Sequence, residues 1–202
     1  MRYRILSRGH SAFTLVELLV VMSIIAALAG LLFPVAGGVN MQVRKVKTKT
    51  LFASIKMGLD QYYTEYQRMP QLSGAGGGGD ISFQSDEPMG RELLSAITGD
   101  VDDDVGKRLN PKTISFCEFS EKQMKDNDSR GLGGYLVDGF GNPFYMIMDF
   151  DYDGKIDRNA ITQIPSRFQP KGDVKGVFAA WSRGPAKSVG EMNTSDLVAS
   201  WK

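Results

Sequence analysis

The sequence predicts an α+β protein in which a long N-terminal helix packs on a small antiparallel sheet. Three observations support this fold class. Residues 18–43 contain no charged side chain, residues 51–66 repeat apolar side chains at helical spacing, and strand-like segments separated by turn dipeptides follow residue 138. One long helix followed mostly by strands indicates an α+β arrangement rather than alternating βαβ units.

Composition narrows the function classes. The chain has 202 residues and a net charge of +1, so its overall charge gives no reason to expect nucleic acid as a partner. Cys117 is the only cysteine and His10 the only histidine. An intrachain disulfide, a histidine-rich zinc site and histidine-dependent catalysis in the folded domain are therefore excluded.

The N-terminal segment predicts a leader followed by a membrane span. Residues 1–12 carry three arginines and no acidic residue, and the uncharged run that follows exceeds the roughly 20 residues needed to cross a bilayer. It is also longer than the apolar region of about 7–15 residues in an ordinary signal peptide. We predict a leader over residues 1–12 and a transmembrane helix over residues 13–39. Basic residues at 44–49 flank its far side, so charge alone does not decide the orientation.

Residues 40–69 predict an amphipathic stem helix that continues the span. Apolar side chains recur every three or four residues, which is typical of a helix face that packs on a core: Leu51, Ile55, Leu59, Tyr62 and Tyr66, widened by Phe52 and Tyr63. Met69 and Pro70 are expected to end this helix, and residues 70–202 to form one globular domain. Pro34 lies inside the span, where it is expected to kink the helix and loosen its second half.

The globular domain is expected to contain one short helix and several strands. Residues 72–89 are glycine-rich and indicate a flexible loop, and residues 101–112 a second loop. "GRELLSAITGD" predicts a helix ended by Gly99. The expected strands are "TISFCEF" (113–119), "FYMIMDF" (144–150) with "GKIDRNAI" (154–161) as its hairpin partner, "GVFAAWS" (176–182) and "LVASW" (197–201).

The segment "AFTLVELLVVMSIIAALAGLLFP", residues 12–34, resembles the N-terminus of type IV pilin-like proteins, which share F-T-L-x-E and a long apolar run. The resemblance implies that a prepilin peptidase cuts between Ala12 and Phe13 and that the new amine of Phe13 is methylated. Ala12 departs from the family, which usually has glycine there. Phe13, Glu17 and Pro34 are the residues that the resemblance implies for assembly.

Two further segments resemble the major pseudopilins of type II secretion systems. "DGFGNPF" (138–144) is similar to their D-x-W-G-N-P turn, and "FAAWSRGPAKSVGEMNTSDLVASW" (178–201) to their C-terminus. The resemblance implies a self-assembling filament subunit, anchored once in the bacterial inner membrane with its C-terminal domain in the periplasm. Its partners would be the prepilin peptidase, an inner-membrane assembly platform and the lipid bilayer. A minor pilin for adhesion or DNA uptake and a membrane-anchored periplasmic binding protein or enzyme remain alternatives.

The segment "DFDYDGKID", residues 149–157, predicts either a calcium loop or a plain hairpin. Its acids have the spacing of positions 1, 3, 5 and 9 of an EF-hand loop: Asp149, Asp151, Asp153 and Asp157. Position 12, which is a bidentate glutamate in an EF-hand, is Ala160 here. Asp153 and Gly154 alternatively form a common two-residue hairpin turn.

The family resemblance implies a different calcium position, in the C-terminal loop. Major pseudopilins bind calcium there, and Asp196 matches their late aspartate. The earlier acid of that loop is replaced by residues 183–186, "RGPA". Calcium is therefore expected, if anywhere, at the four acids of 149–157 or at Asp196.

Enzyme motifs are missing from the sequence. No serine lies in a nucleophile elbow or an S-x-x-K context, and Asp102, Asp103 and Asp104 indicate a solvated loop. Cys117, in an apolar stretch, is expected to be a small core residue. We therefore expect a structural protein rather than an enzyme.

Overall fold

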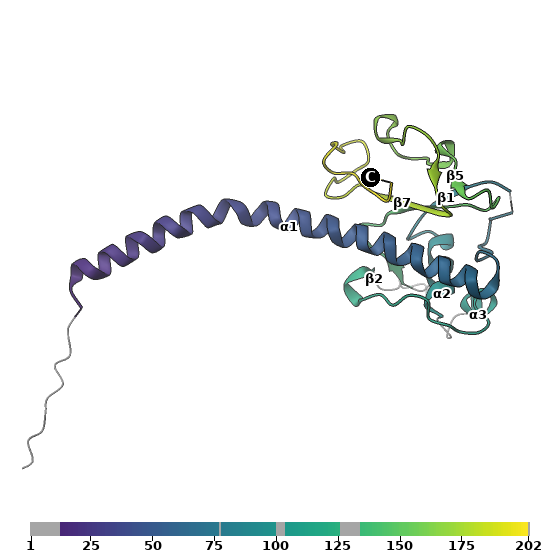
Figure 1. Ribbon diagram of the computed structural model, residues 1–202, viewed down its shortest axis with the longest axis horizontal. Coiled ribbons are helices and arrows are strands. Elements are labelled where there is room, and N and C mark those ends of the chain that lie inside the picture. Colours follow the sequence, from purple (N-terminus) through teal and green to yellow (C-terminus); the bar gives the residue numbers. More distant parts are fainter. Residues whose placement is uncertain (1–12, 77, 100–103, 126–133, 202) are drawn as a thin grey trace, which may run out of the picture. The chain divides into compact units, whose positions relative to one another are not determined.

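The computed structural model describes residues 13–76, 78–99, 104–125 and 134–201; the side chains of residues 31–37 lie outside the described part. The structure is α+β, with an N-terminal helix and a small antiparallel sheet (Figure 1). The chain divides into two compact units, residues 1–42 and residues 43–202. Each unit is described by itself.

Helix α1 (Leu15–Tyr66) is 52 residues long and is assigned without a break. It ends three residues before the predicted limit at Met69, where Gln67 takes a positive φ of 54°. The predicted loosening around Pro34 is wrong at the level of the backbone. Proline removes a single helical hydrogen bond, and the turns on either side keep theirs.

The predicted span over residues 13–39 includes residues 31–37, whose side chains are outside the described part. In the part of the chain that the structure describes, no helix is both long and apolar enough to cross a membrane.

The main sheet has four antiparallel strands in the order β1-β4-β7-β8: Ile81–Gln84, Tyr145–Met148, Phe178–Ser182 and Val198–Ala199. Strands β4, β7 and β8 lie within segments predicted as strands. Strand β1 was not predicted, because the glycines of residues 74–79 suggested that the whole stretch was a loop. Its residues pair in register with β4, Ile81 opposite Met148 and Gln84 opposite Tyr145.

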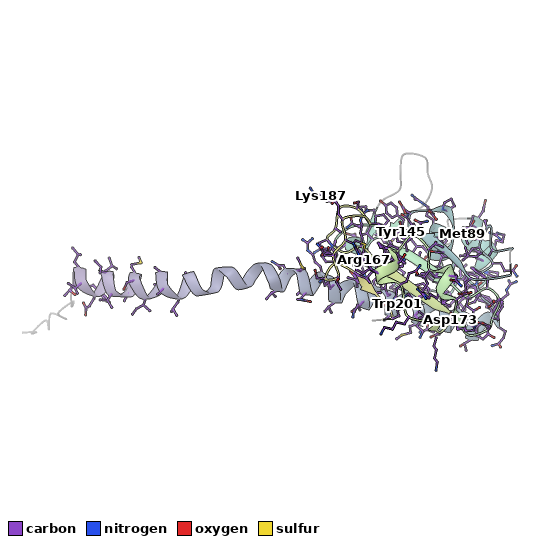
Figure 2. All side chains as sticks on the ribbon, turned by 90° about the horizontal axis from the view of Figure 1, so that it is seen from above. Met89, Tyr145, Arg167, Asp173, Lys187 and Trp201 are labelled. Carbon is purple, nitrogen blue, oxygen red and sulfur yellow. The ribbon has the colours of Figure 1, made fainter. Side chains whose placement is uncertain are left out.

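Both faces of this sheet are covered. Along β4, Met146 and Met148 join a core with α1 and α2 (Pro88–Thr98), while Ile147 points to a second core on the opposite face. That second core contains Trp181, which is fully buried and stacks on Tyr145 with 4.2 Å between ring centroids. Figure 2 shows Tyr145 among the side chains of this unit. The alternation of side chains along β4 therefore builds two cores from one strand.

The stem face is largely confirmed. Its predicted members Leu51, Ile55, Leu59, Tyr62 and Phe52 are buried. The Phe52 ring lies 5.1 Å from that of Phe144, beside β4. Tyr63 is 42% exposed, so its inclusion in the buried face was wrong. It lies at the flank of the buried stripe, where the helix turns toward solvent.

The region between α1 and β4 differs from expectation in two places. Helix α2 is confirmed, with Gly99 as its left-handed C-cap at φ 71°. Helix α3 (Asp104–Leu109) forms where a loop was expected. Residues 113–119 are not a strand, because the backbone N–H groups of Phe116 and Cys117 both donate to the carbonyl of Ile97 instead of to a ladder.

Short elements complete the second unit. Strand β5 (Lys155–Ile156) pairs with β6 (Val174–Lys175), so the predicted hairpin between residues 144–150 and 154–161 is wrong. Strands β2 (Met124–Lys125) and β3 (Tyr135–Leu136) form a further small pair. Three 3₁₀ turns lie at Glu121–Gln123, Arg158–Ala160 and Ser166–Phe168.

Candidate functional site

The first turn of α1 is closed by a reciprocal pair of hydrogen bonds between Thr14 and Glu17. The backbone N–H of Thr14 donates to Glu17 Oε2 at 2.9 Å, and the backbone N–H of Glu17 donates to Thr14 Oγ1 at 3.2 Å. The Thr14 hydroxyl also donates to Glu17 Oε2 at 2.9 Å. This is a capping box, in which residues three apart satisfy each other's free N–H groups at a helix start.

The capping box aims the Glu17 carboxylate back toward the beginning of the helix. Phe13, the predicted mature first residue, directly precedes Thr14, and 79% of it is exposed. Ala12 lies outside the described residues. Pro34 lies within α1, but its side chain is outside the described part. The structure thus brings Glu17 close in sequence and direction to the predicted new N-terminus.

The described side chains of α1 in the first unit are apolar on every side of the helix. Large exposed side chains occur at nearly every position of its first four turns: Leu15, Val16, Leu18, Leu19, Val20, Val21, Met22, Ile24, Ile25 and Leu28. A helix that is hydrophobic all round is one that other apolar material surrounds, either lipid or protein. The monomer supplies no such cover for these side chains among its described residues.

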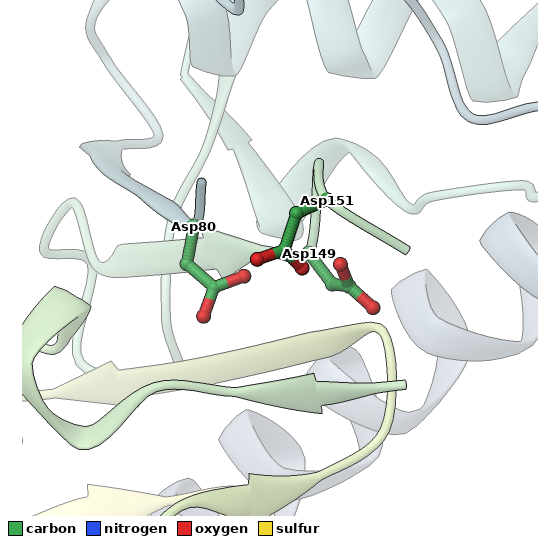
Figure 3. Close-up of side chains that lie close together, drawn as sticks. All are labelled: Asp80, Asp149 and Asp151. Carbon is green, nitrogen blue, oxygen red and sulfur yellow. The ribbon is translucent and has the colours of Figure 1, made fainter. Parts of the chain in front are cut away.

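A cluster of three carboxylates lies at one end of the main sheet (Figure 3). Asp80 comes from the segment just before β1, and Asp149 and Asp151 come from the loop after β4. One oxygen from each of the three lies within 4.8 Å of the others. The antiparallel pairing of β1 with β4 causes this meeting, because it places the start of β1 beside the end of β4.

Burial makes this cluster electrostatically unusual. Asp149 is buried, and its two oxygens accept from the N–H groups of Tyr152 at 2.6 Å and Gly154 at 2.9 Å. Asp80 accepts from the N–H of Asp157, while its other oxygen is buried without a hydrogen bond. Desolvation raises the pKa of both Asp80 and Asp149 above the ordinary range of a carboxyl, and neighbouring aspartates raise it further.

The other predicted calcium ligands are engaged elsewhere. Asp153 forms an ion pair with Lys155 at 3.1 Å, and Asp157 accepts from the N–H of Asn159 at 2.8 Å. Asp196 accepts from the N–H of Asn193 at 2.8 Å in the C-terminal loop. Figure 2 shows Lys187 of that loop well apart from Asp173, the second partner of Lys155. The structure therefore gathers only Asp149 and Asp151 of the five predicted ligands and adds Asp80.

The turn at residues 138–144 is held by one buried carboxylate. Asp138 Oδ1 accepts from the N–H groups of Phe140 at 2.8 Å and Asn142 at 2.9 Å, and Oδ2 accepts from the Ser182 hydroxyl. The Asn142 side chain donates to the carbonyl of Gly184 at 3.0 Å. The pseudopilin-like turn thus joins the starts and ends of β4 and β7, which is a structural rather than a catalytic role.

Comparison with known families bears on the N-terminal segment. Residues 7–33 match the model of the prokaryotic N-terminal methylation motif. The chain carries the methylation motif of type IV pilin-like proteins. The matched range includes Ala12, Phe13 and the capping box. This motif implies processing by a prepilin peptidase and assembly into filaments in general. No curated protein and no solved structure matches the chain.

Two site residues were missed from the sequence of this pilin-like protein. The pattern T-x-x-E before an apolar run signals a capping box, so the partnership of Thr14 with Glu17 was available from the sequence. Asp80 follows four glycines and gave no local signal. Only the pairing of β1 with β4 brings it to Asp149.

Proposed function

We propose that this protein is a structural filament subunit, a pseudopilin of a type II secretion-like apparatus, and not an enzyme. A prepilin peptidase would cut between Ala12 and Phe13, and the subunit would be anchored once in the inner membrane with residues 70–202 in the periplasm. The observation that supports this most is the all-round apolar α1 segment that begins, within the methylation motif, at a capping box. An inner-membrane platform would assemble the subunits.

Glu17 is proposed to set the register between subunits. Cleavage gives Phe13 a positive amine, four residues or about 6 Å along a helix from Glu17. When apolar helices of neighbouring subunits pack, the Glu17 carboxylate of one would neutralise the Phe13 amine of the next. An amine buried in that packing without its partner would be strongly unfavourable.

The capping box gives the test of this role a matched pair of variants. Glu17→Gln keeps an oxygen at the N3 position that can accept from Thr14, but it removes the charge. Thr14→Ala removes the capping hydroxyl at a cost of about 0.5–2 kcal/mol of helix stability, but it keeps the charge. We expect Glu17→Gln to be inserted and cleaved yet absent from sheared filaments, whereas Thr14→Ala assembles. The reverse pattern would assign Glu17 to capping alone.

We further propose that Asp80, Asp149 and Asp151 hold a calcium ion. Calcium prefers carboxylate oxygens and completes its six to eight ligands with backbone carbonyls and water. The support is the close approach of the three carboxylates, together with a buried Asp80 oxygen that no described donor reaches. A bound cation would compensate charges that burial otherwise disfavours.

A further inference from the structure

A cavity of about 620 Å³ lies beside the beginning of the second unit's part of α1. Arg44 and Lys47 from α1 and Lys122 from the Glu121–Gln123 turn bring three cations to its wall. Apolar side chains, among them Leu51 and Phe140, form other parts of the wall. A cavity with three cations and an apolar lining fits a ligand that is anionic at one end and apolar at the other.

The cations of this cavity are not neutralised by the described part of the protein. Among the described residues, neither Lys47 nor Lys122 forms an ion pair within 4.0 Å. The Arg44 guanidinium lies over the Phe140 ring, 5.9 Å from its centroid, which holds it at the wall while its charge remains available.

Asp138 is the one acid in the cavity wall, and its charge is directed elsewhere. Its two oxygens accept from Phe140, Asn142 and Ser182, as described above. Burial raises the pKa of the Asp138 carboxyl, which further weakens its charge. The cavity therefore presents an excess of positive charge to a ligand.

The position of the cavity along the chain identifies the source of the anion. Arg44 is the first charged residue after the uncharged run 18–43, and Lys47 follows less than one helical turn later. A helix anchored in the bilayer by that run places these two side chains at the level of the lipid headgroups. We propose that this cavity binds the phosphodiester headgroup of an anionic phospholipid. The inference rests on the proposed membrane anchoring.

The test measures which lipid the full-length chain retains. The protein is purified in a mild non-ionic detergent, exposed to equal amounts of phosphatidylglycerol and phosphatidylcholine, and analysed by native mass spectrometry. We expect phosphatidylglycerol to be retained at least ten-fold over phosphatidylcholine. Each lysine near an anionic lipid contributes about 1 kcal/mol, which is about five-fold in affinity. The double variant Lys47→Gln with Lys122→Gln should therefore lose most of this preference.

The control removes the same charge from another surface. Lys171→Gln with Lys175→Gln changes two exposed lysines beside β6 that do not line this cavity, and it should keep the preference. Equal loss in both double variants would overturn the proposal, because it would show a general charge effect. Lys122→Glu alone, on an exposed turn away from α1, should also abolish the preference.

Three further outcomes are decisive. Equal retention of the two lipids by the natural chain overturns the lipid site. Complete displacement of phosphatidylglycerol by millimolar inorganic phosphate assigns the cavity to a free anion and also overturns it. Normal cleavage at Phe13 and normal filaments without lipid preference would sink this inference alone. Failure of cleavage would sink the proposed function, while the lipid preference would remain measurable.

Discussion

The backbone N–H of Gly139 donates to the side-chain oxygen of Thr48 at 3.0 Å. Thr48 is buried, and its hydroxyl in turn donates to the carbonyl of Arg44 at 3.0 Å. The turn at residues 138–144 therefore rests directly on helix α1. This close approach requires glycine, because a Cβ on residue 139 would lie 2.2 Å from the Arg44 carbonyl oxygen.

Gly139→Ala should destabilise the second unit by about 2–3 kcal/mol, since either the turn or the helix must move to make room. Gly172→Ala is the matched control, because nothing lies within 4 Å of its Cβ position and it needs no positive φ. Thermal melts of the full-length proteins in detergent measure both. A Gly139→Ala variant as stable as the control would show that the turn is not docked on α1.

Calcium should raise the melting temperature of the full-length protein by several degrees relative to chelator. An ion at 100 times its dissociation constant stabilises the folded form by about 2.7 kcal/mol. Asp80→Asn and Asp151→Asn should each remove most of this shift. Asp104→Asn, which changes a fully exposed carboxylate on α3, should keep it. If Asp196→Asn alone removes the shift, the ion binds in the C-terminal loop.

Stability in chelator should fall as the pH rises above about 4. Burial raises the pKa of Asp80 and Asp149 above the ordinary value of 3.8, so the folded state holds protons that the unfolded chain has lost. Their stabilising contribution is complete below the unfolded pKa and is lost as the pH passes through the raised folded pKa. Urea unfolding at a series of pH values measures this slope.

Asp80→Asn gives the sign of that effect. It should flatten the slope and make the chelated protein more stable at pH 7 than the natural chain. Calcium at pH 7 should restore stability to the natural chain and not to the variant. A chelated natural chain that gains stability from pH 4 to pH 7 would contradict the burial of these carboxylates.

Local periodicity explains what the sequence could predict. Leu51, Ile55 and Leu59 recur at helical spacing and pack on the core, and the alternating "FYMIMDF" segment contains β4. Gly99 ended α2 as its αL conformation allows. Each of these features depends on neighbours within one or two turns of the chain.

Non-local pairing explains what the sequence could not predict. Asp149 closes the loop after β4 by accepting from Tyr152 and Gly154, so the chain turns away before it can form a hairpin with β4. Residues 155–156 then pair with β6 instead. Asp80 reaches the cluster only through the pairing of β1 with β4. The acid spacing alone therefore proposed five ligands, of which the structure brings two together.

The N-terminus of the mature protein tests the central claim most directly. The full-length chain is expressed in cells that contain a prepilin peptidase, extracted from the membrane fraction and analysed by mass spectrometry. The account predicts a chain that begins with N-methylated Phe13, and Phe13→Asp, which places a charge at the cut, should change the products. A chain from those cells that still carries residues 1–12 would contradict the account.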